Sequence, residues 1–486
     1  MIERRVLIIG IDGGNLATLN PWLESGDMPF LRSLFKRNQP QEILCEIDNA
    51  LGWATFLTGK LPVHHFAYYW MGRNLRSKQH GLRVDSRFIG NETLWDVLSA
   101  AGIKCALISV PFTYPPRPIN GCLLSGPGGG LIPGSQMKFS YPETLAHELQ
   151  AKNITYQIKW SGQRAHLNPV AYVTRINRVT QNHIQAAIML LDRHQPDCMM
   201  IVFRGHDSIQ HRACESILSG RLNSRRRLFE AVRGYYRLVD NGMQRIYERI
   251  GAQRCQVTTF VVSDHGFGPC VLKVNIDEYF RRHRMLCFRY SSIFNKFTDQ
   301  FPSLGRFKTG SHSVDMKKTI VYRDSTNSLS LNVGGRDPEG VVSKADFVRI
   351  RGEIMDMLRE MRHPEVGRIF ESIKGSEEFG LDNREYEGYI PDIVFKPRED
   401  VYVDGGLDIR AAGKVFCPMR GRVFLNWTGT HRERGIFAAE NYRGPTQSRS
   451  QTWWETMQPD LTMVAPSVLQ AFGLKTPGWM DGEPLP

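Results

Sequence analysis

The segment Val6-Leu7-Ile8-Ile9-Gly10-Ile11-Asp12-Gly13-Gly14 lies near the start of the 486-residue chain and is the strongest indicator of its fold class. Its first six residues are almost continuously apolar, and a carboxylate followed by two glycines closes the run. Such a run is typical of a parallel strand that is buried on both faces and enters a turn. The segment therefore predicts a strand that delivers Asp12 to the edge of a covered sheet.

The same alternation of apolar run and helical pattern recurs along the chain. Apolar runs occupy 105–110, 199–203 and 257–262, and helical periodicity occupies 91–101, 170–193 and 225–250. Strands that alternate with helices form a parallel sheet covered on both faces, and right-handed crossovers place all their carboxyl ends at one edge. We therefore predict an α/β fold with a mostly parallel central sheet flanked by helices.

One stretch interrupts this alternation. Residues 281–318 are basic and aromatic and have no clean period, although sheet-like and helical patterns return after Lys318. We predict a single domain over residues 1–486, with a small cap or lid insertion at approximately 281–318.

Composition limits the classes of partner. Apolar residues make up 41% of the chain and charged residues 23%, as in ordinary globular proteins, and the formal net charge is +13. A positive surface attracts anions, which include nucleic acids, membrane phosphates and small phosphate esters. Because no zinc-finger spacing or aromatic RNA-binding motif is present, we expect no nucleic-acid partner.

The cysteines and the N-terminal run bear on the compartment. The nine cysteines include no CxxC pair, which favours reduced thiols over a disulfide framework. The apolar run Val6 to Ile11 is too short for a signal peptide or a membrane span. We therefore expect a cytoplasmic protein without a membrane span; oligomeric state has no signal in the sequence.

Three carboxylates, Asp12, Asp207 and Asp264, each follow a predicted parallel strand, where open α/β sheets bind ligands. His211 lies four residues after Asp207, on the same face of a helical turn, and His265 is adjacent to Asp264. Each piece alone also fits a surface pair or a turn. The combination of carboxylate oxygens and imidazole nitrogens predicts a binuclear metal site, with Zn²⁺ preferred and Mn²⁺ or Fe²⁺ as alternatives.

Several motifs make the family specific. The segments Val6–Gly14, Trp53-Ala-Thr-Phe-Leu-Thr-Gly59 and Ser263-Asp-His-Gly-Phe267 resemble the type I phosphodiesterase/nucleotide pyrophosphatase branch of the alkaline phosphatase superfamily. Gly429-Thr-His-Arg432 and the closing segment Asp460 to Gly482 agree with it. The resemblance implies an alkaline phosphatase-like catalytic domain that binds two divalent metal ions. It assigns Asp12, Asp264 and His265 to one ion, and Asp207, His211 and His431 to the other.

The nucleophile position departs from the family pattern. In the family a Thr or Ser stands ten residues before the glycine that closes the Trp53–Gly59 block, and here that residue is Asn49. A carboxamide is a poor nucleophile, so a covalent phospho-enzyme is not expected. We expect Asn49 to contact a metal ion or a phosphoryl oxygen, while metal-bound water attacks phosphorus.

The predicted function follows from the ligands and from Asn49. We expect hydrolysis of a phosphodiester, a pyrophosphate or a related phosphoryl or phosphonate ester, in a small anionic substrate that includes nucleotides. The alternative is a pseudoenzyme that binds metal and phosphate without turnover. A third possibility keeps the fold and changes the substrate, because relatives of this fold also process sulfate esters, transfer phosphoryl groups or isomerise phosphosugars. Asn49 cannot supply the modified Cys or Ser of the sulfatase branch.

Overall fold

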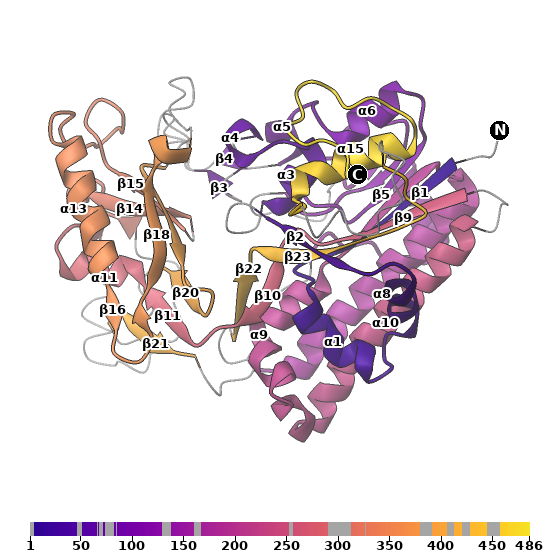
Figure 1. The fold of residues 1–486 in the computed structure, drawn as a ribbon, viewed down its shortest axis with the longest axis horizontal. Coiled ribbons are helices and arrows are strands. Elements are labelled where there is room, and N and C mark those ends of the chain that lie inside the picture. The colour runs from indigo at the N-terminus through magenta and orange to yellow at the C-terminus, as the bar shows by residue number, and fades with distance from the viewer. Residues whose placement is uncertain are drawn as a thin grey trace. The chain divides into compact units, whose positions relative to one another are not determined.

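The structure is a computed structural model that describes residues 4–45, 51–65, 67, 71–72, 82–83, 85–128, 138–159, 167–251, 256–289, 313–325, 327–379, 391–405, 413–419, 428–444 and 457–486. The chain divides into two compact units (Figure 1). The first comprises Met1–Met71, Arg83–Pro269 and Gly421–Pro486. The second comprises Gly72–Leu82 and Cys270–Arg420. The chain crosses from one unit to the other within β3 (Met71–Gly72), within β4 (Leu82–Arg83), after Pro269 and after Arg420.

The first unit is built on an eight-stranded sheet in the order β2-β23-β9-β1-β8-β5-β6-β7. Its five central strands are parallel: β9 (Gln256–Val262), β1 (Arg4–Ile11), β8 (Cys198–Phe203), β5 (Cys105–Ile108) and β6 (Gly121–Leu124). Antiparallel pairings occur towards the edges. There β23 (Arg434–Glu440) pairs antiparallel with both β9 and β2 (Gln41–Leu44), and β7 (Ser140–Tyr141) pairs antiparallel with β6. The predicted α/β fold with a mostly parallel sheet is confirmed.

Strand β1 shows why a continuous apolar run is required. Leu7, Ile9 and Ile11 belong to the core on one face of the sheet, whereas Val6 and Ile8 belong to the core on the other. Side chains alternate along a strand, so a strand covered on both faces needs apolar residues at every position.

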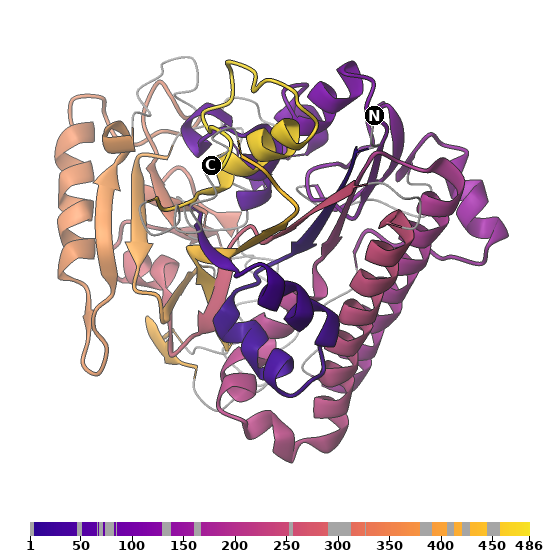
Figure 2. The ribbon, with the colours of Figure 1, turned by 45° about the vertical axis from the view of Figure 1, so that its right-hand side comes forward.

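Helices cover both faces (Figure 2). One face packs against α1 (Leu16–Glu24), α2 (Pro29–Arg37), α7 (Leu145–Ala151), α8 (Pro169–His194), α9 (Gly205–Leu218) and α10 (Arg226–Gly251). The other packs against α3 (Gly52–Thr58), α6 (Leu94–Ala100) and α15 (Val464–Ala471). Short elements complete the unit: α4 (Pro62–His65), α5 (Ser86–Ile89), η1 (Arg221–Ser224) and η6 (Leu461–Met463). None of the helices within the described ranges is long and apolar enough to cross a membrane.

The second unit has its own apolar core. Its main sheet has the order β14-β15-β19-β18, formed by Val321–Ser325, Ser328–Leu331, Ile393–Pro397 and Phe370–Gly375. A second sheet has the order β20-β11-β21, formed by Val401–Asp404, Leu272–Asn275 and Phe416–Pro418. The remaining elements are α11 (Ile276–Arg282), α13 (Phe347–Glu360), η3 (Ser376–Phe379), β16 (Arg362–His363) and β17 (Gly367–Arg368).

The predicted insertion at 281–318 lies within this second unit. Its described ends form β12 (Phe288–Arg289), which pairs antiparallel with β13 (Ser313–Val314), and residues 290–312 lie outside the described ranges. The second unit is longer than that segment. The assignment of one domain with a cap insertion stays a prediction.

Acid is expected to destabilise the first unit through His183 of α8. This side chain is 4% exposed, its ring stacks on Tyr156 with centroids 4.7 Å apart, and its Nε2 donates to the Gln157 carbonyl oxygen over 2.9 Å. Burial lowers the pKa of His183 from 6.5 to about 4. Between pH 6.5 and pH 4 the His183 ring is protonated in the unfolded chain but stays neutral in the folded chain. Its contribution to stability is therefore complete above pH 6.5 and is lost as the pH falls towards 4.

The measurement is the free energy of unfolding in urea between pH 7 and pH 4, for the native chain and for His183→Gln. Each such histidine contributes a slope of about 1.4 kcal/mol per pH unit. Glutamine keeps a donor and does not titrate, so the variant should show a slope smaller by this amount. Equal slopes for the two proteins would refute the prediction.

Candidate metal centre

The carboxyl ends of three neighbouring strands bring three carboxylates together. Strand β1 lies between β8 and β9, with Ile11 opposite Phe203 and Gly10 opposite Val262. Asp12 directly follows β1, Asp264 follows β9, and Asp207 lies in the first turn of α9 after β8. The three carboxylates therefore lie at one edge of the sheet, as the strand pattern predicts.

The pair Asp207 and His211 lies on one face of α9. Asp207 Oδ1 is 3.1 Å from His211 Nε2 across one helical turn. The predicted four-residue spacing thus directs both side chains to the same point.

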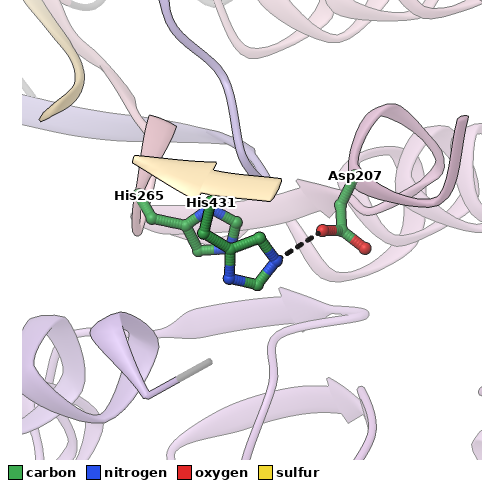
Figure 3. A group of neighbouring side chains, drawn as sticks. All are labelled: Asp207, His265 and His431. Atoms are coloured by element: carbon green, nitrogen blue, oxygen red, sulfur yellow. Dashed lines mark ion pairs between the residues drawn. The ribbon is translucent and has the colours of Figure 1, made fainter. Parts of the chain in front are cut away.

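His431 reaches this point through strand pairing. Strand β22 (Gly429–Arg432) pairs antiparallel with β10 (Gly266–Pro269), which places His431 opposite Phe267. Figure 3 shows the His431 ring between His265 and Asp207. The His265 and His431 rings stack with centroids 3.7 Å apart, and His431 Nε2 lies 3.3 Å from Asp207 Oδ1.

Three of these atoms form a nearly equilateral triangle. Asp207 Oδ1 is 3.1 Å from His211 Nε2 and 3.3 Å from His431 Nε2, and the two nitrogens are 3.1 Å apart. A tetrahedral Zn²⁺ ion with ligands at about 2.0–2.1 Å separates neighbouring ligand atoms by about 3.3 Å. The triangle has the dimensions of one face of such a site.

Hydrogen bonds at the other ring nitrogens fix two imidazole tautomers. His265 Nδ1 lies 2.9 Å from the Gly266 carbonyl oxygen, and His211 Nδ1 lies 3.3 Å from that of Gly429. A carbonyl oxygen can only accept, so in the neutral rings Nδ1 carries the proton and Nε2 presents a lone pair. Backbone carbonyls orient metal-binding histidines in this way.

The second ligand set lies beside the first. His265 Nε2 is 3.4 Å from Asp264 Oδ2 and 3.7 Å from Asp12 Oδ1, and the ligand atoms of the three residues all lie within 4.8 Å of one another. The Gly13 N–H donates to Asp264 Oδ1 over 3.2 Å and holds this carboxylate in place. His265 also lies within 4.8 Å of Asp207 and His431, so the two sets adjoin.

The charged forms of the second set's carboxylates, Asp12 and Asp264, are disfavoured by burial and by neighbouring negative charge. Burial, and then the charges of Asp264 and Asp207, raise the pKa of Asp12 well above its usual value. Burial also raises the pKa of Asp264, and the charge of Asp207 adds to this effect. Buried carboxylates that repel one another are stabilised by a cation.

Two members of the first set, Asp207 and His431, are held in the ionisation state that binds metal. Burial alone would raise the pKa of Asp207, but the neighbouring His211 and His431 outweigh it, and the Asp207 pKa falls well below its usual value. Burial, and then the charge of His265, lower the pKa of His431 to about 3. Among the described residues, the buried Asp207 Oδ1 receives no hydrogen bond. An ionised carboxylate beside the neutral His431 imidazole fits a divalent cation.

The structure brings the six predicted ligand residues together: Asp12, Asp207, His211, Asp264, His265 and His431. Their roles as ligands stay predictions. Asn49 lies outside the described residues, which resume at Leu51.

Two supporting residues had no role in the sequence argument. Ser263 Oγ donates to the Gly14 carbonyl oxygen over 2.6 Å and accepts the Ile436 N–H over 2.7 Å, so it ties the Asp12 turn to β23. Gly52 packs against Asp264, where a β-carbon would lie 2.2 Å from the Asp264 carbonyl oxygen. Ser263 belongs to the Ser263–Phe267 motif, but only the three-dimensional contacts show that Ser263 and Gly52 support the candidate ligands.

The fold and these residues define an alkaline phosphatase-like α/β protein with a candidate binuclear centre at the carboxyl edge of its sheet. The chain belongs to the type I phosphodiesterase/nucleotide pyrophosphatase family, whose model matches residues 6–414. The family resemblance of the motifs is confirmed.

Solved structures share the fold over their whole length. Phosphonoacetate hydrolase from Sinorhizobium meliloti 1021, in complex with phosphonoformate, is 13% identical with a TM-score of 0.55, over 97% of this chain and 96% of that one. Murine ectonucleotide pyrophosphatase/phosphodiesterase 5 is 12% identical with a TM-score of 0.53, over 98% and 96%. Wild-type alkaline phosphatase PafA is 12% identical with a TM-score of 0.59, over 100% and 99%. No curated protein matches the chain.

Proposed function

We propose that the chain hydrolyses phosphodiester, pyrophosphate or related phosphoryl or phosphonate ester bonds of small anionic substrates, at a centre for two divalent cations. The observation that carries the proposal is the triangle of Asp207 Oδ1, His211 Nε2 and His431 Nε2, with edges of 3.1 to 3.3 Å. Family membership supports it, as do relatives of this fold that hold phosphonoformate or AMP.

The donor set supports Zn²⁺ as the ion, with Mn²⁺ or Fe²⁺ as alternatives, because oxygen and imidazole nitrogen ligands suit all three. Asp12, Asp264 and His265 would hold one ion, and Asp207, His211 and His431 the other. When bound, a pair of ions neutralises charge on the attacking and leaving oxygens of a phosphoryl group. The Gly266 and Gly429 carbonyls keep the Nε2 lone pairs of His265 and His211 directed at the centre.

Asn49 is proposed to act beside this centre without attacking phosphorus. The described residues on either side of the 46–50 segment are anchored near the ligands. Cys45 donates its N–H to the Glu433 carbonyl oxygen over 2.8 Å, and Gly52 packs against Asp264. We infer that Asn49 contacts a metal ion through its oxygen or donates from its amide to a phosphoryl oxygen, while a water molecule attacks.

The stereochemical course at phosphorus tests this proposal. A phosphorothioate diester with a chiral phosphorus should be hydrolysed with inversion, because attack by water is a single displacement. Asn49→Ala should still invert but should be about 100-fold slower, the usual effect of losing one charge-stabilising donor. Retention of configuration by the native enzyme would refute attack by water.

A metal- and phosphate-binding pseudoenzyme is the second candidate, and the replacement of the nucleophile by Asn49 favours it. The two functions differ in a panel of aryl phosphodiesters, pyrophosphates and phosphonate esters with added Zn²⁺ or Mn²⁺. Binding of two ions without turnover of any substrate would support the pseudoenzyme.

We further propose a cytoplasmic location and no nucleic-acid partner. The described cysteines are thiols, most of them buried, which supports a reducing compartment. Fractionation of cells and a filter-binding assay with DNA and RNA would test the two statements.

A further inference from the structure

The C-terminal segment 479–482 docks on the turn that joins α3 to α4; we call this segment the C-terminal clasp. The Asp481 N–H donates to the Gly59 carbonyl oxygen over 2.8 Å. In return, the Leu61 N–H donates to Asp481 Oδ2 over 2.7 Å, and His64 Nδ1 donates to the same carboxylate over 2.8 Å. Asp481 thus binds the turn through both its backbone and its side chain.

Packing adds to these hydrogen bonds. Gly59 ends α3 with a positive φ of 61°, and a β-carbon there would lie 3.0 Å from Met480 Sδ. The Lys60 ammonium lies over the Trp479 ring, 5.3 Å from its centroid. The clasp therefore fits a turn that only glycine forms without strain.

The turn is coupled to α3 by a buried histidine. His65 Nδ1 accepts the Ala67 N–H over 3.0 Å, so Nε2 carries the ring proton and donates to Thr55 Oγ1 over 3.0 Å. Burial lowers the pKa of His65 to about 3, which keeps the ring neutral and this tautomer fixed. Movement of α4 would therefore displace α3.

Helix α3 in turn packs against the candidate metal centre. Gly52 packs against the Asp264 carbonyl oxygen, and Trp53 fills the space above Gly10, where a β-carbon would lie 2.7 Å from the indole. Leu51, directly before α3, is the residue at which the described chain resumes after the segment that contains Asn49. The position of α3 therefore bears directly on the position of Asp264.

We propose that Asp481 is a positioning residue for the candidate centre. By fixing the Gly59–Leu61 turn, it holds α3 at the correct depth against Asp264, one of the six candidate ligand residues. This role rests on the proposed function, since it concerns the geometry of the same reaction. Both oxygens of the Asp481 carboxylate accept hydrogen bonds, from the Leu61 N–H and from His64 Nδ1.

The test compares native holoenzyme with Asp481→Asn and Asp481→Ala. Asparagine keeps one acceptor oxygen and alanine keeps none, so kcat should fall a few-fold and then about 10- to 100-fold, as expected for a misplacement of up to about 1 Å. KM should stay within about twofold and metal content should not change, because the ligands are intact. Amide hydrogen exchange of residues 51–65 should be about tenfold faster in Asp481→Ala.

Tyr442→Phe is the matched control, because the Tyr442 hydroxyl donates to the Leu485 carbonyl oxygen over 2.8 Å and so holds the same tail without touching the turn. It should leave kcat and the exchange of residues 51–65 at native values. Native kcat in Asp481→Ala, or an equal loss in Tyr442→Phe, would overturn the positioning role.

Hydrogen exchange separates this inference from the proposed function. If native holoenzyme hydrolyses no phosphoester, the proposed function is wrong, and the coupling is then judged by exchange alone. Faster exchange throughout residues 51–58 of Asp481→Ala supports the coupling of clasp to α3. Faster exchange confined to the 59–61 turn overturns it.

Discussion

Asp264→Asn is expected to lower kcat by at least roughly a thousandfold and to reduce bound metal from two ions per chain to one. The amide retains an oxygen that can accept the Gly13 N–H, which donates to Asp264 Oδ1 over 3.2 Å, so the turn keeps its shape. What is lost is the negative charge in the set with Asp12 and His265. Metal analysis of purified protein and hydrolysis of an aryl phosphodiester measure the two effects.

Asp240→Asn is the control for removing a buried carboxylate. Asp240 of α10 accepts the N–H groups of Phe30 and Leu31 over 3.0 and 2.9 Å and belongs to neither ligand set. This variant should lose about 1–3 kcal/mol of stability and keep its metal and its kcat. The metal assignment would be wrong if Asp264→Asn kept two ions and a kcat within tenfold of native.

Gly52→Ala is expected to lower kcat by about 100-fold, because about 1 Å of displacement in an active site has effects of this size. The added methyl carbon would lie 2.2 Å from the Asp264 carbonyl oxygen, well inside van der Waals contact, and this oxygen belongs to the backbone. Either α3 or the Asp264 turn must move. Overpacking of this kind also costs about 1–3 kcal/mol of stability, which urea unfolding measures.

Gly234→Ala in α10 is the matched control. A β-carbon at Gly234 would meet only the Asn177 Nδ2 atom, at 3.7 Å, which is ordinary contact. Alanine in a helix interior is favoured over glycine by up to about 1 kcal/mol, so this variant should be slightly more stable with native kcat. If Gly52→Ala matched it in stability and kcat, the close packing of α3 on Asp264 would play no part in the reaction.

Local sequence patterns were sufficient to predict most of the parallel sheet and two pairs of site residues. Four of the five parallel strands, β1, β5, β8 and β9, coincide with predicted apolar runs, whereas β6 was not predicted. The alternation of Leu7 and Ile8 between opposite cores requires such runs. The helical spacing of Asp207 and His211 and the adjacency of Asp264 and His265 depend only on local geometry, so the chain order was sufficient to find them. His431 could be found as a candidate ligand only through the family resemblance. Asn49 was assigned to the nucleophile position because it lies ten residues before Gly59.

The contacts among these pieces depend on the tertiary structure. The pairing of β22 with β10 places His431 against Asp207, and the Gly266 and Gly429 carbonyls select the imidazole tautomers. The packing of Gly52 on Asp264, and the hydrogen bond from the Leu61 N–H to Asp481, likewise join residues far apart in the chain. Local periodicity encodes which face of an element is buried, whereas these contacts depend on strand register and on packing between elements, which the whole core fixes.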